Sequence, residues 1–334
     1  MRNFLLLASF FIIGLAILFV VFSQTDTNNQ FINPLTSPES ESETGSNKDL
    51  PLNKYTFANL AATDFKVSQI IKEKIISDEE GYTSYLFSYQ VEGKKVTGML
   101  NLSDNPQTQL PAVILLRGYA DDSIYFTGLG TRKAAGVLAQ NGFITLAPDF
   151  LGFGGSDAAA ADILEARFYR PVTVLALLKA VENFAPVDPN KIFLWGHSNG
   201  GQIALSVLEI TQRNLPTVLW APVTADFPEC VLYYMGELDD QGRKVKAAIE
   251  DFDENYNGRD FSVDAHLDLI NAPIQLHQGG RDPLIPERWT DDFLNQMKEL
   301  NKEIDYHFYP QADHNLVPDW DGVMAETVSF FKSF

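Results

Sequence analysis

The stretch of sequence that decides the fold is residues 192–201, which read IFLWGHSNGG. Its apolar first half predicts a short buried strand, and the residues from Gly201 onward predict a helix. Between the two lies a Gly-x-Ser-x-Gly pattern, with Gly196 and Gly200 on either side of Ser198. Glycines let a strand and a helix pack closely around a sharp turn, which would hold the Ser198 hydroxyl clear of the backbone. The pattern also occurs in ordinary glycine-rich turns, but the flanking strand and helix favour a catalytic serine.

Apolar runs and helical patterns alternate along the rest of the chain. This alternation predicts an α/β fold, in which a mostly parallel sheet is covered by helices on both faces. Further strands are expected at residues 65–71, 82–91, 95–102, 112–116, 143–147, 217–220, 274–277 and 304–309. Further helices are expected at residues 131–140, 163–184, 287–300 and 322–331. Pro171 is expected to break or kink the second of these helices.

Residues 225–269 interrupt the alternation, because they are rich in acidic and aromatic side chains. We interpret them as a small helical cap insertion over the strand ends, since long insertions in compact domains tend to be functional. The alternative is a surface helical hairpin with no role in substrate choice.

The N-terminal region differs in composition from the rest. An apolar run from Phe4 to Phe22 is long enough to cross a bilayer, and Arg2 precedes it. Residues 1–23 therefore predict a single-pass membrane anchor with the catalytic domain extracytoplasmic, or a cleaved signal peptide that leads to secretion. Residues 24–53, rich in Ser, Thr, Asn, Pro and Glu, predict a disordered tether. Residues 54–334 are expected to form the folded domain.

Composition excludes several classes of function. The formal net charge of -19 argues against a nucleic-acid partner, because little basic surface is available to neutralise phosphates. The glycine-rich loop at residues 148–157 has no Gly-Lys-Ser/Thr ending, so a nucleotide site is not expected. Cys230 is the single cysteine of the chain, which rules out an intramolecular disulfide, and no basic neighbour in sequence would activate it.

A serine nucleophile needs a base and an acid, and the chain supplies both. His314 follows the last expected strand, where its imidazole could reach Ser198. Asp282 follows the preceding strand, and Asp226 is the alternative acid. The order Ser198, Asp282, His314 is that of α/β-hydrolases. His197 is expected to shape the pocket, because adjacent side chains at a tight turn diverge.

An oxyanion hole completes the expected site. Its donors would be the backbone N–H groups of Asn199, at the start of the helix, and of Tyr119, in the loop after the strand at residues 112–116. The Tyr119 phenol is a candidate third donor, and its other role would be to line the pocket. The helix N-terminus also favours the negative charge that develops there.

Together these features resemble the α/β-hydrolases, and more narrowly the catalytic domain of the prolyl oligopeptidase family and its acyl-hydrolase relatives. The resemblance rests on residues 98–100, 117–119, 149–156, 187–192, 196–201, 280–286 and 314. It implies an α/β-hydrolase fold and an acyl-enzyme mechanism with no metal or organic cofactor. Arg117 departs from the pattern, because relatives often have His before Gly118. The dienelactone hydrolases use Cys as nucleophile, so Ser198 argues against their chemistry.

The sequence therefore predicts a serine hydrolase that cleaves a small-molecule ester or a peptide. The resemblance favours a prolyl oligopeptidase-like peptidase. A carboxylesterase is the alternative, because too few residues precede the core to build the β-propeller of full-length prolyl oligopeptidases, and a small cap suits an esterase. A catalytically inactive binding module of the same fold is a third interpretation.

Overall fold

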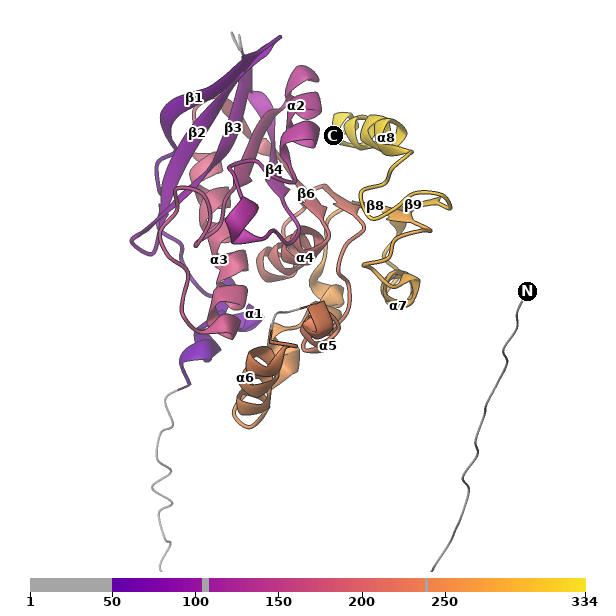
Figure 1. Cartoon of the computed structure of the whole chain (residues 1–334). Helices are drawn as coiled ribbons and strands as arrows, with labels where there is room; N and C mark the ends of the chain where they lie inside the picture. Colours follow the sequence, from indigo (N-terminus) through magenta and orange to yellow (C-terminus); the bar gives the residue numbers. More distant parts are fainter. Residues whose placement is uncertain (1–49, 104–107, 238–239) are drawn as a thin grey trace, which may run out of the picture. The chain divides into compact units, whose positions relative to one another are not determined.

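The structure is a computed structural model that describes residues 50–103, 108–237 and 240–334 (Figure 1). The predicted anchor at residues 1–23 and nearly all of the predicted tether lie outside these described residues. Residues Pro51–Tyr55, at the end of the predicted tether, form the 3-10 helix η1. Among the described residues, none of the helices has the length and apolar character that a bilayer span requires.

A nine-stranded sheet organises the folded region, in the order β1-β2-β3-β5-β4-β6-β7-β8-β9. The pairs β1–β2, β2–β3 and β3–β5 are antiparallel. The pairs β5–β4, β4–β6, β6–β7, β7–β8 and β8–β9 are parallel. This confirms the predicted fold class. The strands are β1 (Ile71–Glu79), β2 (Tyr82–Val91), β3 (Lys94–Ser103), β4 (Leu110–Leu116), β5 (Ile144–Pro148), β6 (Val187–His197), β7 (Thr217–Trp220), β8 (Ile274–Gly279) and β9 (Ile304–Tyr309).

Helices cover both faces of the sheet, because the central strands are apolar on both sides. In β6, Leu194 belongs to the core cluster that contains α3 (Ile163–Glu182) and α4 (Asn199–Thr211). Its neighbours Phe193 and Trp195 belong to the other cluster, with α2 (Arg132–Gln140) and α8 (Trp320–Lys332). Figure 1 shows α2 and α8 on one side of the sheet and α3 and α4 on the other. The helix α7 (Glu287–Glu299) packs on the same side as α3 and α4, because its buried apolar residues belong to their core cluster.

The segment between β7 and β8 is helical. It contains α5 (Glu229–Leu232), η3 (Met235–Glu237), α6 (Arg243–Asp253), η4 (Gly258–Phe261), η5 (Val263–Ala265) and η6 (Leu267–Leu269). Phe252 of α6 packs on Phe168 of α3, with ring centroids 5.8 Å apart, and Phe261 packs on the same ring at 4.6 Å. The segment is therefore attached to the α3 side of the sheet, where α1 (Phe57–Ala61) also lies (Figure 1).

One expectation about local structure is wrong, and the break expected at Pro171 is absent. The strand expected at residues 65–71 begins only at Ile71 and runs to Glu79, because it is an exposed edge strand fixed by its hairpin to β2 and not by burial. Gly81, with φ of 88°, makes that turn. Pro171 does not break α3, which continues from Ile163 to Glu182. Its ring is buried there among the apolar side chains of the helix.

Candidate active site

Ser198 occupies a sharp turn between β6, which ends at His197, and α4, which begins at Asn199. Its φ of 57° and ψ of -123° are strained for a residue other than glycine. Only glycine fits at positions 196 and 200, because a side chain at either position would collide with neighbouring backbone. A Cβ added at Gly200 would lie 1.9 Å from the carbonyl oxygen of Leu116, and one at Gly196 would lie 2.6 Å from that of Gly200. The expected strained turn is confirmed.

Asp282 and His314 meet across the loops that follow β8 and β9. His314 donates from Nδ1 to Asp282 Oδ2 at 2.8 Å, and the Asp282 side chain is almost fully buried. Asp282 also accepts from the backbone N–H groups of Leu284, at 2.8 Å, and Ile285, at 3.0 Å. Burial raises the pKa of Asp282, but the hydrogen bonds from His314 and the two N–H groups outweigh it, so the pKa is lowered. The ionised carboxylate holds the proton of His314 on Nδ1, which leaves Nε2 as the basic nitrogen.

Asp226, the alternative acid, does not contact this imidazole. It lines a separate pocket with Glu229 and Asp264, beneath α7. The structure therefore pairs His314 with Asp282.

His197 connects the serine turn to the histidine loop. Its Nε2 donates to the backbone carbonyl of His314 at 2.9 Å, and the two imidazole centroids lie 4.7 Å apart. Burial, together with the nearby His314, lowers the pKa of His197 to about 4, so the ring is neutral at pH 7. His197 thus fixes the backbone of His314. Sequence reasoning gave it only a pocket-shaping role, and its position beside Ser198 was the one signal for this contact.

Ser198 directly follows His197, whose side chain bonds the backbone of His314. Within the described residues, Ser198 Oγ makes no hydrogen bond to the imidazole of His314. Such bonds are often long in enzymes without substrate and shorten when substrate binds. The structure thus joins Asp282 to His314 directly and joins His314 to the Ser198 turn through His197.

The loop after β4 approaches the serine turn closely. A Cβ added at Gly118 would lie 3.0 Å from Ser198 Cβ, so the next residue, Tyr119, is within reach of a group bound to Ser198. Among the described residues, the backbone N–H groups of Tyr119 and Asn199 donate to no protein acceptor. Both are therefore available to an oxyanion. The Tyr119 side chain is 76% exposed, so its phenol stands largely in solvent.

Arg117 has a defined structural role in this loop. Its guanidinium donates to the carbonyl of Gly118 at 2.9 Å and to that of Asp149 at 3.2 Å. It also lies over the rings of Phe153, at 4.2 Å, and Tyr125, at 4.7 Å. Arg117 therefore braces the loop that carries Tyr119 against the glycine-rich loop after β5.

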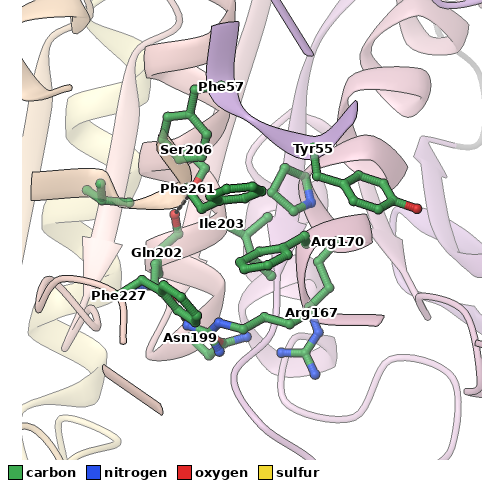
Figure 2. A pocket seen from close by; sticks show the side chains of 13 residues that line it. Tyr55, Phe57, Arg167, Arg170, Asn199, Gln202, Ile203, Ser206, Phe227 and Phe261 are labelled. Carbon is green, nitrogen blue, oxygen red and sulfur yellow. Dashed lines mark hydrogen bonds between the residues drawn. The ribbon is translucent and has the colours of Figure 1, made fainter. Parts of the chain in front are cut away.

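A cavity of about 40 Å³ lies beside Asn199 on the α3 side of the sheet (Figure 2). Its walls come from α3, α4, the helical segment between β7 and β8, and the N-terminal helices η1 and α1. Among its lining residues are Arg167, Arg170, Gln202, Phe227 and Phe261. Cys230 is buried nearby and accepts from Arg167 Nη2 at 3.1 Å, so the thiol is held in a structural contact.

No group of three or more His, Cys, Asp or Glu side chains in the described part of the chain is arranged to hold a metal ion.

The fold and the site define a hydrolase of the α/β-hydrolase class. The chain matches the dienelactone hydrolase family over residues 96–326, and it belongs to this family. The α/β-hydrolase assignment from sequence is confirmed, but the family found is not the prolyl oligopeptidase family. Position 198 carries serine, whereas we expected the dienelactone hydrolases to use cysteine there, so Ser198 does not exclude membership of this family.

Individual relatives agree with this assignment. An Escherichia coli (strain K12) protein, whose name places it among the carboxymethylenebutenolidases, is 25% identical over 220 residues, or 65% of this chain and 70% of its own. An acetyl xylan esterase from Paenibacillus sp. R4 is similar in structure, with a TM-score of 0.62 and 16% identity over 87% of this chain and 96% of its own. A puromycin-hydrolyzing peptidase of Mycobacterium tuberculosis has a TM-score of 0.60 and 14% identity, over 77% of this chain and 40% of its own. These two structural likenesses show the fold alone.

Proposed function

We propose that this protein is a serine carboxylesterase that hydrolyses a small-molecule ester through an acyl-enzyme. The observation that carries the proposal is the buried Asp282–His314 hydrogen bond beside the strained turn of Ser198. Membership of a family named for the hydrolysis of a lactone, which is a cyclic ester, favours an ester over a peptide. The peptidase function that the sequence favoured has no comparable support at the level of family.

In the proposed mechanism, Ser198 Oγ attacks the ester carbonyl while His314 Nε2 takes the hydroxyl proton. The oxyanion accepts hydrogen bonds from the N–H groups of Asn199 and Tyr119. The C–O bond to the alcohol then breaks, and His314 returns the proton to the departing oxygen. A water molecule, deprotonated by His314, hydrolyses the acyl-enzyme and releases the carboxylic acid and free Ser198.

Kinetics on a panel of substrates tests this proposal. The purified domain is expected to hydrolyse acyl esters and to leave matched aminoacyl amides intact, and Ser198→Ala is expected to abolish ester hydrolysis. Faster cleavage of the amides would restore the peptidase interpretation. If no ester or amide is hydrolysed by wild type, the inactive binding module is the better interpretation.

We also propose that residues 1–23 export the protein, as a membrane anchor with the catalytic domain outside or as a cleaved signal. The apolar run from Phe4 to Phe22 supports this. Protease treatment of intact cells that produce the full chain is the test. Degradation of an anchored domain, or its recovery from the medium, would support export, and full protection inside the cell would contradict it.

A further inference from the structure

A second cavity lies on the other side of the sheet from the one beside Asn199. Its volume is about 190 Å³, and residues of both α2 and α8 line it. Figure 1 shows these two helices together on one side of the sheet. Two of the lining side chains, Phe126 and Lys133, are exposed, so the cavity opens to solvent. A small molecule can therefore enter it from outside.

The walls of this cavity are aromatic. Three of the four tryptophans of the chain line it, namely Trp195, Trp220 and Trp320. The rings of Trp195 and Trp220 lie 5.2 Å apart at 68°, and those of Trp220 and Trp320 lie 5.9 Å apart at 81°. Rings that meet nearly at right angles offer both faces and edges to a further ring, which is the geometry that aromatic pairs prefer. Trp220 also donates from Nε1 to Thr327 Oγ1 at 3.1 Å, so this wall is fixed.

The polar groups of the cavity select against a cationic ligand. Arg132 and Lys133 line it at the start of α2, and among the described residues no carboxylate side chain does. Arg132 lies 3.8 Å from Glu79, whereas Lys133 has no ion pair within the described chain and lies over the Trp320 ring at 3.2 Å. The ammonium of Lys133 and the amide of Asn315 are hydrogen-bond donors. A neutral ring that carries an oxygen acceptor fits this set.

The cavity also reaches the support of the proposed base. His197 lines it, and the same side chain donates from Nε2 to the backbone carbonyl of His314. Asn315, the residue after His314, lines it as well. Of the residues that the structure describes, those in the lining include neither Ser198 nor Asp282. A molecule in this cavity would thus contact the residues that hold His314 without contacting the proposed nucleophile.

We infer that this cavity binds a small neutral aromatic molecule with an oxygen acceptor, and that the bound molecule acts on turnover by holding His197 and the loop of His314 in place. The volume suits one ring with a short substituent, since an engineered apolar cavity of about 150 Å³ holds benzene. Apolar walls with a few polar groups are typical of small-molecule sites. The binding site is independent of the proposed function, and its effect on turnover rests on that function.

Acetophenone tests the binding site, because it has one ring and one carbonyl oxygen. The readout is the set of indole N–H signals in the NMR spectrum of the wild-type protein, one for each of the four tryptophans. The signals of Trp195, Trp220 and Trp320 are expected to shift as acetophenone is added. The signal of Trp289 is expected to stay, because Trp289 lies in α7 and bonds Glu229. No shift, or an equal shift of all four signals, would overturn the inference.

A matched ligand tests the role of the aromatic ring. Cyclohexyl methyl ketone keeps the carbonyl of acetophenone but has a saturated ring. It is expected to bind about 2- to 10-fold more weakly, which is the worth of one aromatic contact. Equal or tighter binding of the saturated ketone would contradict an aromatic site.

Two alanine positions provide matched variants. Ala134 of α2 lines the cavity, so Ala134→Leu fills part of the space and is expected to abolish the shifts. Ala247→Leu makes the same change at an exposed position of α6 and is expected to keep them. If Ala134→Leu does not fold, Trp320→Leu removes one wall and is expected to weaken binding about 2- to 10-fold. Unchanged binding in the cavity variant that folds would overturn the inference.

Kinetics on ethyl butanoate measures the effect on turnover. Saturating acetophenone is expected to raise kcat about 2- to 5-fold with KM unchanged, because the hydrogen bond from His197 to His314 is held more firmly. Ala134→Leu should lose this increase. A higher KM with constant kcat would mean that acetophenone competes with substrate, and that result, or no change in either constant, would overturn the inference. If the indole signals shift but no ester is hydrolysed, the proposed function fails and the binding site stands.

Discussion

His197 Nε2 donates to the backbone carbonyl of His314 at 2.9 Å, which ties the turn of the proposed nucleophile to the loop of the proposed base. The contact matters because Ser198 and His314 come from distant parts of the chain and need a fixed spacing. Burial keeps the pKa of His197 low, so the ring that makes this contact is neutral at pH 7. His197 is in this view a positioning residue for His314.

Replacing His197 by Phe keeps the ring but removes the donor. We expect kcat to fall about 5-fold with little change in KM, because the loss of one hydrogen bond of about 1 kcal/mol loosens His314. Steady-state kinetics on an acyl ester is the measurement. His266→Phe is the matched control, because His266 Nε2 bonds the carbonyl of Arg259 at 3.0 Å in an exposed position. An equal loss in both variants would remove the positioning role.

The pKa of His197 also predicts how stability depends on pH. Its folded pKa of about 4 lies below the ordinary value of 6.5, so between these two pH values the unfolded chain binds a proton that the folded chain does not. The free energy of unfolding should therefore decrease as the pH falls from about 6.5 to about 4. Urea unfolding at several pH values is expected to give a smaller decrease for His197→Phe than for wild type. If the free energy of unfolding changed equally with pH in wild type and His197→Phe, the lowered pKa of His197 would be contradicted.

The two candidate acids can be separated by amide substitution. Asp282→Asn removes the charge that holds the His314 proton on Nδ1, so we expect kcat to fall about 10³- to 10⁴-fold, as for such substitutions in other serine hydrolases. Asp226→Asn should stay within about 3-fold of wild type, because Asp226 lines a different pocket. Kinetics with one activated ester decides between them. A larger loss in Asp226→Asn would reverse the assignment.

The glycine after Asn199 should tolerate no side chain. A Cβ at Gly200 would meet the backbone of Leu116, which cannot move away without disturbing β4, so Gly200→Ala is expected to cost at least about 3 kcal/mol of stability. Gly322 of α8 is the control, since a Cβ there meets nothing within 4 Å. Gly322→Ala is expected to stabilise by about 0.5 to 1 kcal/mol, because alanine favours the helix. Thermal unfolding of both variants gives the comparison, and similar midpoints would contradict it.

Much of this arrangement could be predicted from the sequence. The strand–turn–helix around Ser198 has a local cause in its apolar run and its glycines. Asp282 follows β8, a buried strand that lies between β7 and β9. The order of the three residues along the chain therefore sufficed to pair Asp282 with His314, which the structure shows in contact.

Other features depend on contacts that the sequence does not encode locally. The edge strand β1 has alternating charges in place of an apolar pattern, and Pro171 is tolerated inside α3 because tertiary packing surrounds it. Nor does any local pattern show that Arg167 and Arg170 of α3 line one cavity with Asn199 of α4, because that arrangement depends on how the two helices pack.

The central claim is that Ser198 is a nucleophile activated by His314. The most direct measurement is mass spectrometry of the intact domain and its peptides after incubation with a fluorophosphonate. The account predicts one adduct per chain, located on Ser198, and labelling that is strongly slowed in His314→Ala. No adduct, an adduct at another residue, or equal labelling rates in wild type and His314→Ala would contradict it.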